Sequence, residues 1–161
     1  MSRYRAQRIT STAPAADAAV GLYLMAAANN GFSLKRVTAG LVMVGSAASP
    51  VDQNGLLGIS PATAGPTGSP TSLTVTKMKS WYGANNAVIA STFATTNPTF
   101  GAQTTDSHSI PVNSRSGYEG VWEVPQEWDT LNGTANGWVF VNRGNTLNSP
   151  LAWVITLEWE E

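Results

Sequence analysis

The sequence predicts an all-β protein built as a sandwich of two sheets. Short runs that alternate apolar and polar residues recur along the 161 residues, and Gly, Pro and Asn residues typical of turns separate them. No long stretch follows the 3.6-residue repeat of an amphipathic helix.

The clearest strand is the last one, at residues 151–161. Successive side chains of a strand point to opposite faces of its sheet. Here five large apolar residues share one parity, namely Leu151, Trp153, Ile155, Leu157 and Trp159. A face of that size needs a cover, which a second sheet or an oligomer partner would supply. We therefore expect the remaining strands to be built around this one.

The first third of the chain contains three predicted strands, at residues 4–10, 20–28 and 32–44. Asn29-Asn30-Gly31, between the second and the third, is a β-hairpin signal. Residues 45–71 hold four prolines and five glycines, so a long surface loop is expected there. Because long loops in compact domains are often functional, this loop is a candidate contact surface.

The remainder of the chain adds predicted strands at residues 72–81, 87–93, 118–124 and 138–141. A second long polar loop, also a candidate contact surface, is expected at residues 94–117. With the final strand, the pattern amounts to about eight strands and two long loops in a single domain, residues 1–161. That count predicts a jelly-roll-like sandwich.

The charges at the two ends of the chain predict one strand pairing. If the first and last strands are antiparallel neighbours, Arg3 faces Glu160 and Arg5 faces Glu158 in the same register. Opposite charges directly across a strand pair contribute roughly 0.2–1 kcal/mol, and less at an exposed edge.

Composition excludes several kinds of chemistry. Charged residues make up 12% of the chain, the formal net charge is −1, and there is no cysteine. Disulfides, a thiolate nucleophile and a cysteine-ligated zinc site are therefore excluded. The charge balance is unlike that of a nucleic-acid-binding domain. The start of the sequence shows no signal region and no apolar run long enough for a bilayer, so we expect synthesis in a cytoplasm and no membrane partner.

No residue pattern predicts catalysis. His108, the only histidine, lies near Asp106 and two serines in one polar loop, whereas a working triad places its members on separate, held elements. Glu119 and Glu123 would lie about 13 Å apart along a strand, beyond the roughly 5–9.5 Å of glycosidase carboxylates. The acids near Asp52 and Asp106 lack the spacing of a calcium loop. We expect no enzyme activity, no metal and no cofactor.

A basic group near the start of the chain is a candidate for partner contact. Arg3, Arg5 and Arg8 form it, together with Lys35 and Arg36. The group serves either to contact an acidic surface, nucleic acid or an oppositely charged subunit, or to pair across strands with the acidic tail. Three arginines provide few phosphate contacts, so nucleic acid is not expected as a partner.

Three aromatic residues are further candidates, because two of them precede a predicted turn and the third follows Pro125. These are Trp81, Tyr82 and Trp128. Exposed aromatic rings either stack on sugars or anchor a protein interface. The tryptophans inside strand patterns, such as Trp138 and Trp153, are expected in the core or in a subunit interface.

Two stretches of the chain resemble a group of small virion proteins of tailed bacteriophages. The first is residues 13–20, Ala-Pro-Ala-Ala-Asp-Ala-Ala-Val. The second is the closing part, which contains Gly-Val-Trp-Glu-Val-Pro at 120–125, Trp-Val-Phe-Val-Asn at 138–142 and Ile-Thr-Leu-Glu-Trp-Glu-Glu at 155–161. The middle loops are not part of the resemblance.

The resemblance implies a jelly-roll decoration or cement protein and no catalytic residues. We accordingly expect a non-enzymatic structural protein that binds the outer head surface as a homotrimer. Its partners would be the major capsid protein or other virion subunits, and it would stabilise contacts between capsomers.

Three other functions remain open at this point. One is another virion role, as a tail, baseplate or fibre component or as a small-virus coat protein with a basic arm. The second is a carbohydrate-binding β-sandwich that uses Trp81, Tyr82 or Trp128. The third is an enzyme that depends on His108.

Overall fold

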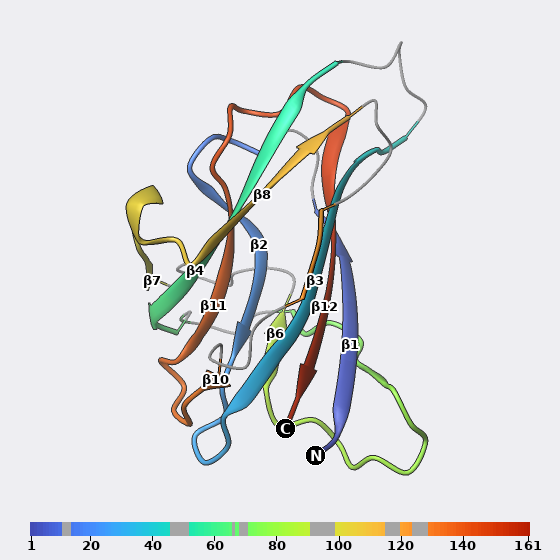
Figure 1. Ribbon diagram of the computed structural model, residues 1–161, viewed down its shortest axis with the longest axis vertical. Helices are drawn as coiled ribbons and strands as arrows, with labels where there is room; N and C mark the ends of the chain where they lie inside the picture. Colours follow the sequence, from blue (N-terminus) through green and yellow to red (C-terminus); the bar gives the residue numbers. More distant parts are fainter. Residues whose placement is uncertain are drawn as a thin grey trace.

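The computed structural model shows an all-β sandwich of two antiparallel sheets (Figure 1). The structure describes residues 1–10, 14–45, 52–65, 67, 71–90, 99–114, 120–123 and 129–161. Within these residues there is no α-helix, only the short 3-10 helix η1 (Gln103–Thr105). None of the described residues forms a helix with the length and apolar character that crossing a membrane requires.

Each sheet contains six strands in the described part of the chain. Sheet A runs β10-β3-β12-β1-β5, with β9 also paired to β3. Its strands are β1 (Arg3–Ile9), β3 (Phe32–Met43), β5 (Thr76–Lys77), β9 (Gly120–Glu123), β10 (Asp129–Thr130) and β12 (Leu151–Glu160).

Sheet B runs β6-β2-β11-β4-β7, with β8 also paired to β4. Its strands are β2 (Ala18–Met25), β4 (Asn54–Ala64), β6 (Val88–Ala90), β7 (Thr99–Phe100), β8 (His108–Asn113) and β11 (Gly137–Asn142).

The eight longest described strands follow the path of a jelly roll. They are β1, β2, β3, β4, β8, β9, β11 and β12. Sheet A contains them in the order β1-β12-β3-β9, and sheet B in the order β2-β11-β4-β8. Counted along the chain from one to eight, the two sheets are 1-8-3-6 and 2-7-4-5, which is a pair of Greek keys. The predicted all-β, two-sheet fold is confirmed.

Strand β12 lies inside sheet A between β1 and β3, as expected from its apolar face (Figure 1). Trp153, Ile155, Leu157 and Trp159 are fully buried against residues of sheet B such as Leu57. The cover that this face requires is therefore supplied by the second sheet of the same chain.

The predicted register of the first and last strands is confirmed. Arg3 lies opposite Glu160, and Arg5 lies opposite Glu158. The ion pair of Arg3 is formed diagonally with Glu158, at 3.3 Å, because a long side chain reaches the i, j±2 neighbour across a strand pair. Glu160 instead pairs with Lys35 of β3 at 3.6 Å.

The expected loop at residues 45–71 is wrong, because it contains β4, a long strand of sheet B. The glycines and the single proline of β4 are tolerated for specific reasons. A Cβ on Gly55 would come within 2.7 Å of the Trp153 ring, so the residue must be small. Pairing of β4 with β8 ends at Ile59, and pairing of β4 with β7 begins only at Ala62. Pro61 lies in this gap, so its nitrogen, which cannot donate a hydrogen bond, faces an unpaired part of the strand edge.

The expected loop at residues 94–117 is also wrong in its second half. Strand β8 pairs with β4 over six residues and buries Ile110 and Val112. Ser109, Pro111 and Asn113 alternate with these two and are not buried, so the segment resembles a loop in composition while it packs only one face. The strand expected at residues 72–81 is reduced to β5, two residues paired with β1.

The hairpin expected at Asn29-Asn30-Gly31 is wrong as well. The segment connects β2 of sheet B with β3 of sheet A, so it crosses between the layers instead of joining paired strands. Gly31 is required there because a Cβ would collide with the backbone carbonyl of Thr130, 2.1 Å away.

Candidate functional site

The turn after β5 presents an exposed tryptophan. The backbone N–H of Tyr82 donates to the carbonyl of Lys79 at 3.2 Å, which closes a β-turn with Trp81 at its third position. Trp81 is 76% exposed, the highest fraction of any aromatic residue in the described part of the chain. Tyr82 is half-buried and meets Trp81 edge to face, with ring centroids 6.3 Å apart.

The start of β1 and the last residue of the sequence hold this turn in place. The Tyr4 hydroxyl donates to the carbonyl of Gly83 at 3.2 Å, and the Tyr4 ring packs against the rings of Tyr82 and Trp159. The Glu161 carboxylate accepts the backbone N–H groups of Asn86 and Ala87 at 2.6 and 2.9 Å. Trp81 is therefore exposed on a supported turn.

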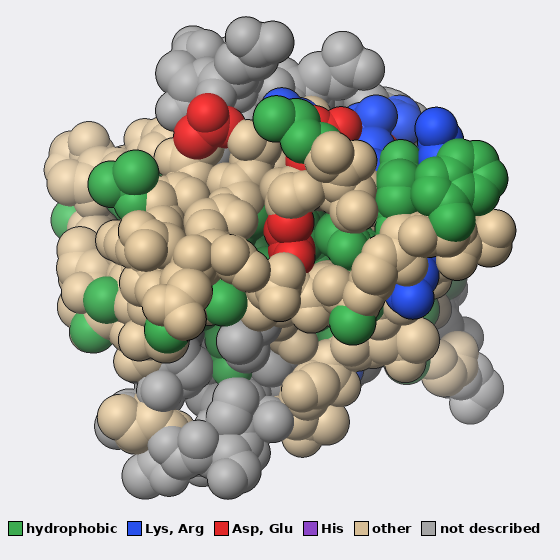
Figure 2. Space-filling model, turned by 90° about the horizontal axis from the view of Figure 1, so that it is seen from below, with side chains coloured by type: hydrophobic (Ala, Val, Ile, Leu, Met, Phe, Trp, Pro, Cys, Tyr) green, Lys and Arg blue, Asp and Glu red, His purple; other side chains and the backbone are tan. Residues whose placement is uncertain are grey.

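Basic side chains surround the exposed ring. The Lys79 ammonium lies 5.3 Å from the Trp81 ring centroid, a cation–π distance. Lys77 and Arg5 are exposed, and the side chain of Arg3 is 40% exposed beside Glu158. Figure 2 shows hydrophobic side chains at one edge of this end of the molecule with Lys and Arg next to them. We call Arg3, Arg5, Lys77, Lys79 and Trp81 the basic corner.

The structure brings together four of the six residues predicted to contact a partner. Arg3, Arg5, Trp81 and Tyr82 belong to this end of sheet A. Arg8 does not join them, because it has the core-facing parity of β1, opposite Ile155, and is partly buried. Trp128 lies outside the described residues. Lys77 and Lys79 were missed, although their place just before Trp81 in the sequence was the available signal.

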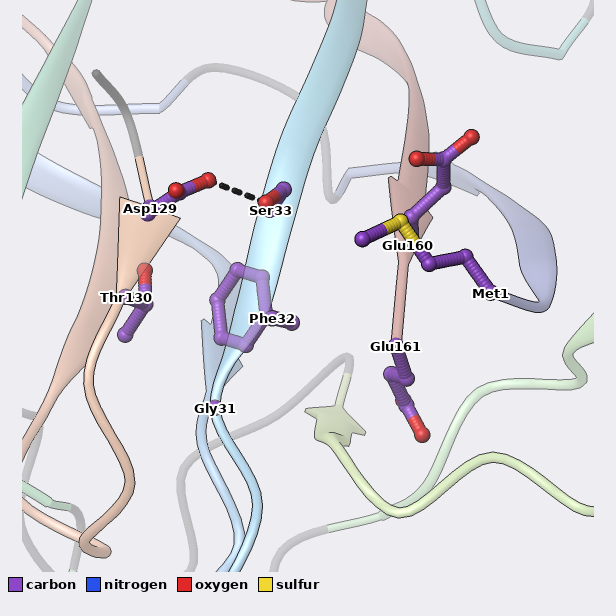
Figure 3. Close-up of a pocket in the computed structure, with 8 residues that line it drawn as sticks. All are labelled: Met1, Gly31, Phe32, Ser33, Asp129, Thr130, Glu160 and Glu161. Carbon is purple, nitrogen blue, oxygen red and sulfur yellow. Dashed lines mark hydrogen bonds between the residues drawn. The ribbon is translucent and has the colours of Figure 1, made fainter. Parts of the chain in front are cut away.

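A shallow hollow of about 240 Å³ lies at the same end of the molecule. Figure 3 shows the Phe32 ring between β10 on one side and Glu160 with Met1 on the other. Its lining residues are Met1, Gly31, Phe32, Ser33, Asp129, Thr130, Glu160 and Glu161. Asp129 is exposed and accepts a hydrogen bond from the Ser33 hydroxyl. We call this feature the terminal hollow.

A buried ion pair closes the outer face of sheet B. The Arg143 guanidinium donates to both Asp106 carboxylate oxygens at 2.8 Å, and each side chain is only 3% exposed. It also donates to the Gly101 carbonyl at 2.7 Å. The hydrogen bond with Asp106 raises the pKa of Arg143, against the opposing effect of burial. These bonds fix Gly101 and Asp106 to the residue that directly follows β11.

This pair also bears on the catalytic and calcium hypotheses. Both Asp106 oxygens accept hydrogen bonds from Arg143, so this carboxylate serves the ion pair and does not orient His108. His108 belongs to β8, opposite Ile59, and burial lowers its pKa. Asp52 accepts a hydrogen bond from the Asn113 amide at 3.3 Å. Among the described residues, no three His, Asp or Glu side chains gather as metal ligands.

No protein-family model, curated protein or solved structure matches this chain. The geometry of the described residues is therefore the basis for a function. The basic corner offers an indole, several cations and a supported turn, which together suit binding to an acidic partner.

Proposed function

We propose that the protein is a non-enzymatic structural protein of a virion, of the kind that decorates the outer surface of a capsid. The observation that carries the proposal is the 1-8-3-6 and 2-7-4-5 strand order. This architecture recurs in viral capsid domains, lectins and cupins. Because fold alone does not decide function, the resemblance of the chain's two ends to small phage virion proteins selects among these classes.

The basic corner supports a role in contact with another subunit. Tryptophan and arginine are enriched among residues that dominate protein interfaces, and Trp81 combines high exposure with a supported backbone. The two long loops are weaker candidates than the sequence suggested, since they contain β4 and β8, which are strands of sheet B. The corner is therefore the preferred contact surface.

The position of β1 disfavours a small-virus coat protein with a basic arm. Residues 3–9 pair with β12 along their whole length, so Arg3 and Arg5 are held in a sheet and do not extend toward a genome. A tail, baseplate or fibre component uses the same kind of contact surface as a decoration protein, and the two are separated by experiment.

The test is co-sedimentation of the purified protein with heads and with tails of the phage that carries its gene. We expect saturable binding to heads and a higher melting temperature of the shell, because a protein that binds the intact shell better than the dissociated one stabilises it. Binding to tails alone would replace decoration with the tail role. Binding to neither would contradict a structural virion protein.

The exposure of Trp81 also favours a second candidate, a carbohydrate-binding module. Two features count against it. Lys79 lies over one face of the indole, and Tyr82 meets the indole at 73° instead of extending it as a flat platform. A glycan titration followed by tryptophan fluorescence tests this candidate. A saturable change that Trp81→Ala removes would support sugar binding.

A further inference from the structure

We propose that the basic corner of one copy docks on the terminal hollow of a second copy. The inference rests on the proposed function, for which the resemblance to phage virion proteins implies a homotrimer, and it names the two surfaces that form the contact. The terminal hollow is defined above by Phe32, Asp129, Glu160 and their neighbours.

The first surface is suited to insertion. Trp81 is exposed at the third position of a β-turn, and hydrogen bonds with Tyr4 and Glu161 hold the backbone that follows it. Little flexibility is then lost when the ring is buried in a partner, and preorganisation of this kind favours affinity. Lys79 would enter the contact together with the ring, since its ammonium lies 5.3 Å from the Trp81 ring centroid.

The second surface matches the first in size and charge. The hollow of about 240 Å³ is smaller than the roughly 300–1,000 Å³ of sites for drug-sized ligands, and it suits a single large side chain. Its floor contains the Phe32 ring, and the exposed Asp129 and the partly exposed Glu160 stand at its rim (Figure 3). An indole would pack on Phe32 while Lys79 meets Asp129.

The two surfaces share no residue on one copy, although Arg3 of the corner lies opposite Glu160 of the hollow. The basic corner belongs to the β1–β5 side of sheet A, and the hollow lies between β10 and the end of β12. Contact between unlike surfaces of neighbouring copies closes into a ring when the rotation between the copies allows it. The expected homotrimer is one such ring.

A second copy fits the corner better than single-stranded nucleic acid does. Sequence-tolerant binding of single strands relies on successive aromatic rings along a basic groove. In the part of the chain that the structure describes, Trp81 is the only aromatic residue with an exposed side chain. The hollow, in contrast, carries carboxylates that match the corner's cations.

The test measures the mass of the full chain by size-exclusion chromatography with light scattering over a range of concentrations. We expect a defined oligomer for the unaltered protein. Trp81→Ala and Lys79→Glu on one surface, and Asp129→Lys on the other, should each weaken association at least roughly tenfold. The two charge reversals mixed together should associate again, because each restores the opposite charge to its partner.

The controls separate the contact from folding and from net charge. Asp52→Lys changes an exposed aspartate just before β4, whose Gly55 packs on Trp153 near the start of β12, whereas the corner and the hollow lie at the end of β12. This control should leave the mass unchanged. Circular dichroism verifies that each variant is folded. A monomer at every concentration, or an oligomer insensitive to all three substitutions, would overturn the inference.

Two further outcomes distinguish this inference from the proposed function. A monomer that still binds heads would leave decoration standing and remove the self-contact. An oligomer sensitive to these substitutions that binds no virion part would do the reverse. Fluorescence quenching of Trp81 by a single-stranded oligonucleotide, in a monomeric protein, would assign the corner to nucleic acid and overturn the self-contact.

Discussion

The outer faces of the two sheets differ in what covers them. On sheet B, an apolar cluster that includes Tyr23, Val139 and Val141 is buried, with Phe100 packed against it. The Arg143–Asp106 pair fastens the segment that carries Phe100. On sheet A, the outer face near the chain ends carries charges in rows.

The register of sheet A makes these rows explicit. Arg5, Glu158 and Arg36 are consecutive partners across β1, β12 and β3. Their signs alternate, so neighbouring strands attract each other. The outer face of sheet B is therefore covered by residues of its own chain, whereas sheet A keeps charged side chains that water or a partner can contact.

The largest expected effect comes from breaking the pair on sheet B. Asp106→Asn leaves the buried Arg143 charge without its carboxylate, which should lower the free energy of unfolding by about 3–5 kcal/mol. Denaturant unfolding measures the loss. Asp17, which contacts the same guanidinium but is 68% exposed, is the matched control, and Asp17→Asn should change stability by less than about 0.5 kcal/mol. Equal losses would contradict a buried clamp.

Alkaline pH should act on the covered face through Tyr23. Burial raises the pKa of Tyr23 to about 12, from an ordinary value of 10.0. The unfolded chain therefore releases this proton at lower pH than the folded chain does. The stabilisation from this group is complete below about pH 10 and is lost as the pH rises toward about 12, by about 2–3 kcal/mol in total.

The measurement is denaturant unfolding across that alkaline range, for the unaltered protein and for Tyr23→Phe. The substitution removes the ionisable group, so the variant should lose this part of the pH dependence. Identical pH profiles for the two proteins would show that Tyr23 is not protected from water in solution.

A smaller effect is expected where β4 passes beneath the ion pair. A Cβ added at Gly58 would lie 2.3 Å from an Asp106 oxygen and 2.6 Å from the Arg143 Cγ. Gly58→Ala should therefore cost about 1–3 kcal/mol of stability by overpacking. Gly83, where a Cβ would meet nothing within 4 Å, provides the control for thermal unfolding. A neutral Gly58→Ala would mean that the covering segment yields easily.

The smallest effect is expected on sheet A. The pair between Arg3 and Glu158 is partly exposed, so a double-mutant cycle with Arg3→Gln and Glu158→Gln should give a coupling of roughly 0.2–1 kcal/mol. Added salt should reduce it. A salt-independent coupling above that range would place this pair in the same class as Arg143–Asp106.

Features that depend on residues close together in one strand were predicted correctly, and features that depend on packing between distant residues were not. Strand β12 was recognisable because its largest apolar residues share one parity. The register that puts Arg3 opposite Glu160 followed from the signs of the charges. Strand β4 was not recognisable, since its glycines and Pro61 are explained only by the Trp153 ring and by the gap between β8 and β7. Of the site, the exposed aromatic turn and the contribution of Arg3 and Arg5 were predictable, but their meeting at one end of the sandwich and the hollow were not.

The amino-acid sequence alone is enough to predict the all-β class, the core strand at residues 151–161 and the charge register of β1 with β12. These features depend on neighbours along one strand, where a repeat of two residues is visible directly. The strand order of the two sheets, the Arg143–Asp106 pair and the support of Trp81 by Tyr4 and Glu161 appear only in the folded structure. Each joins residues distant along the chain, because close packing selects partners by shape and charge in space.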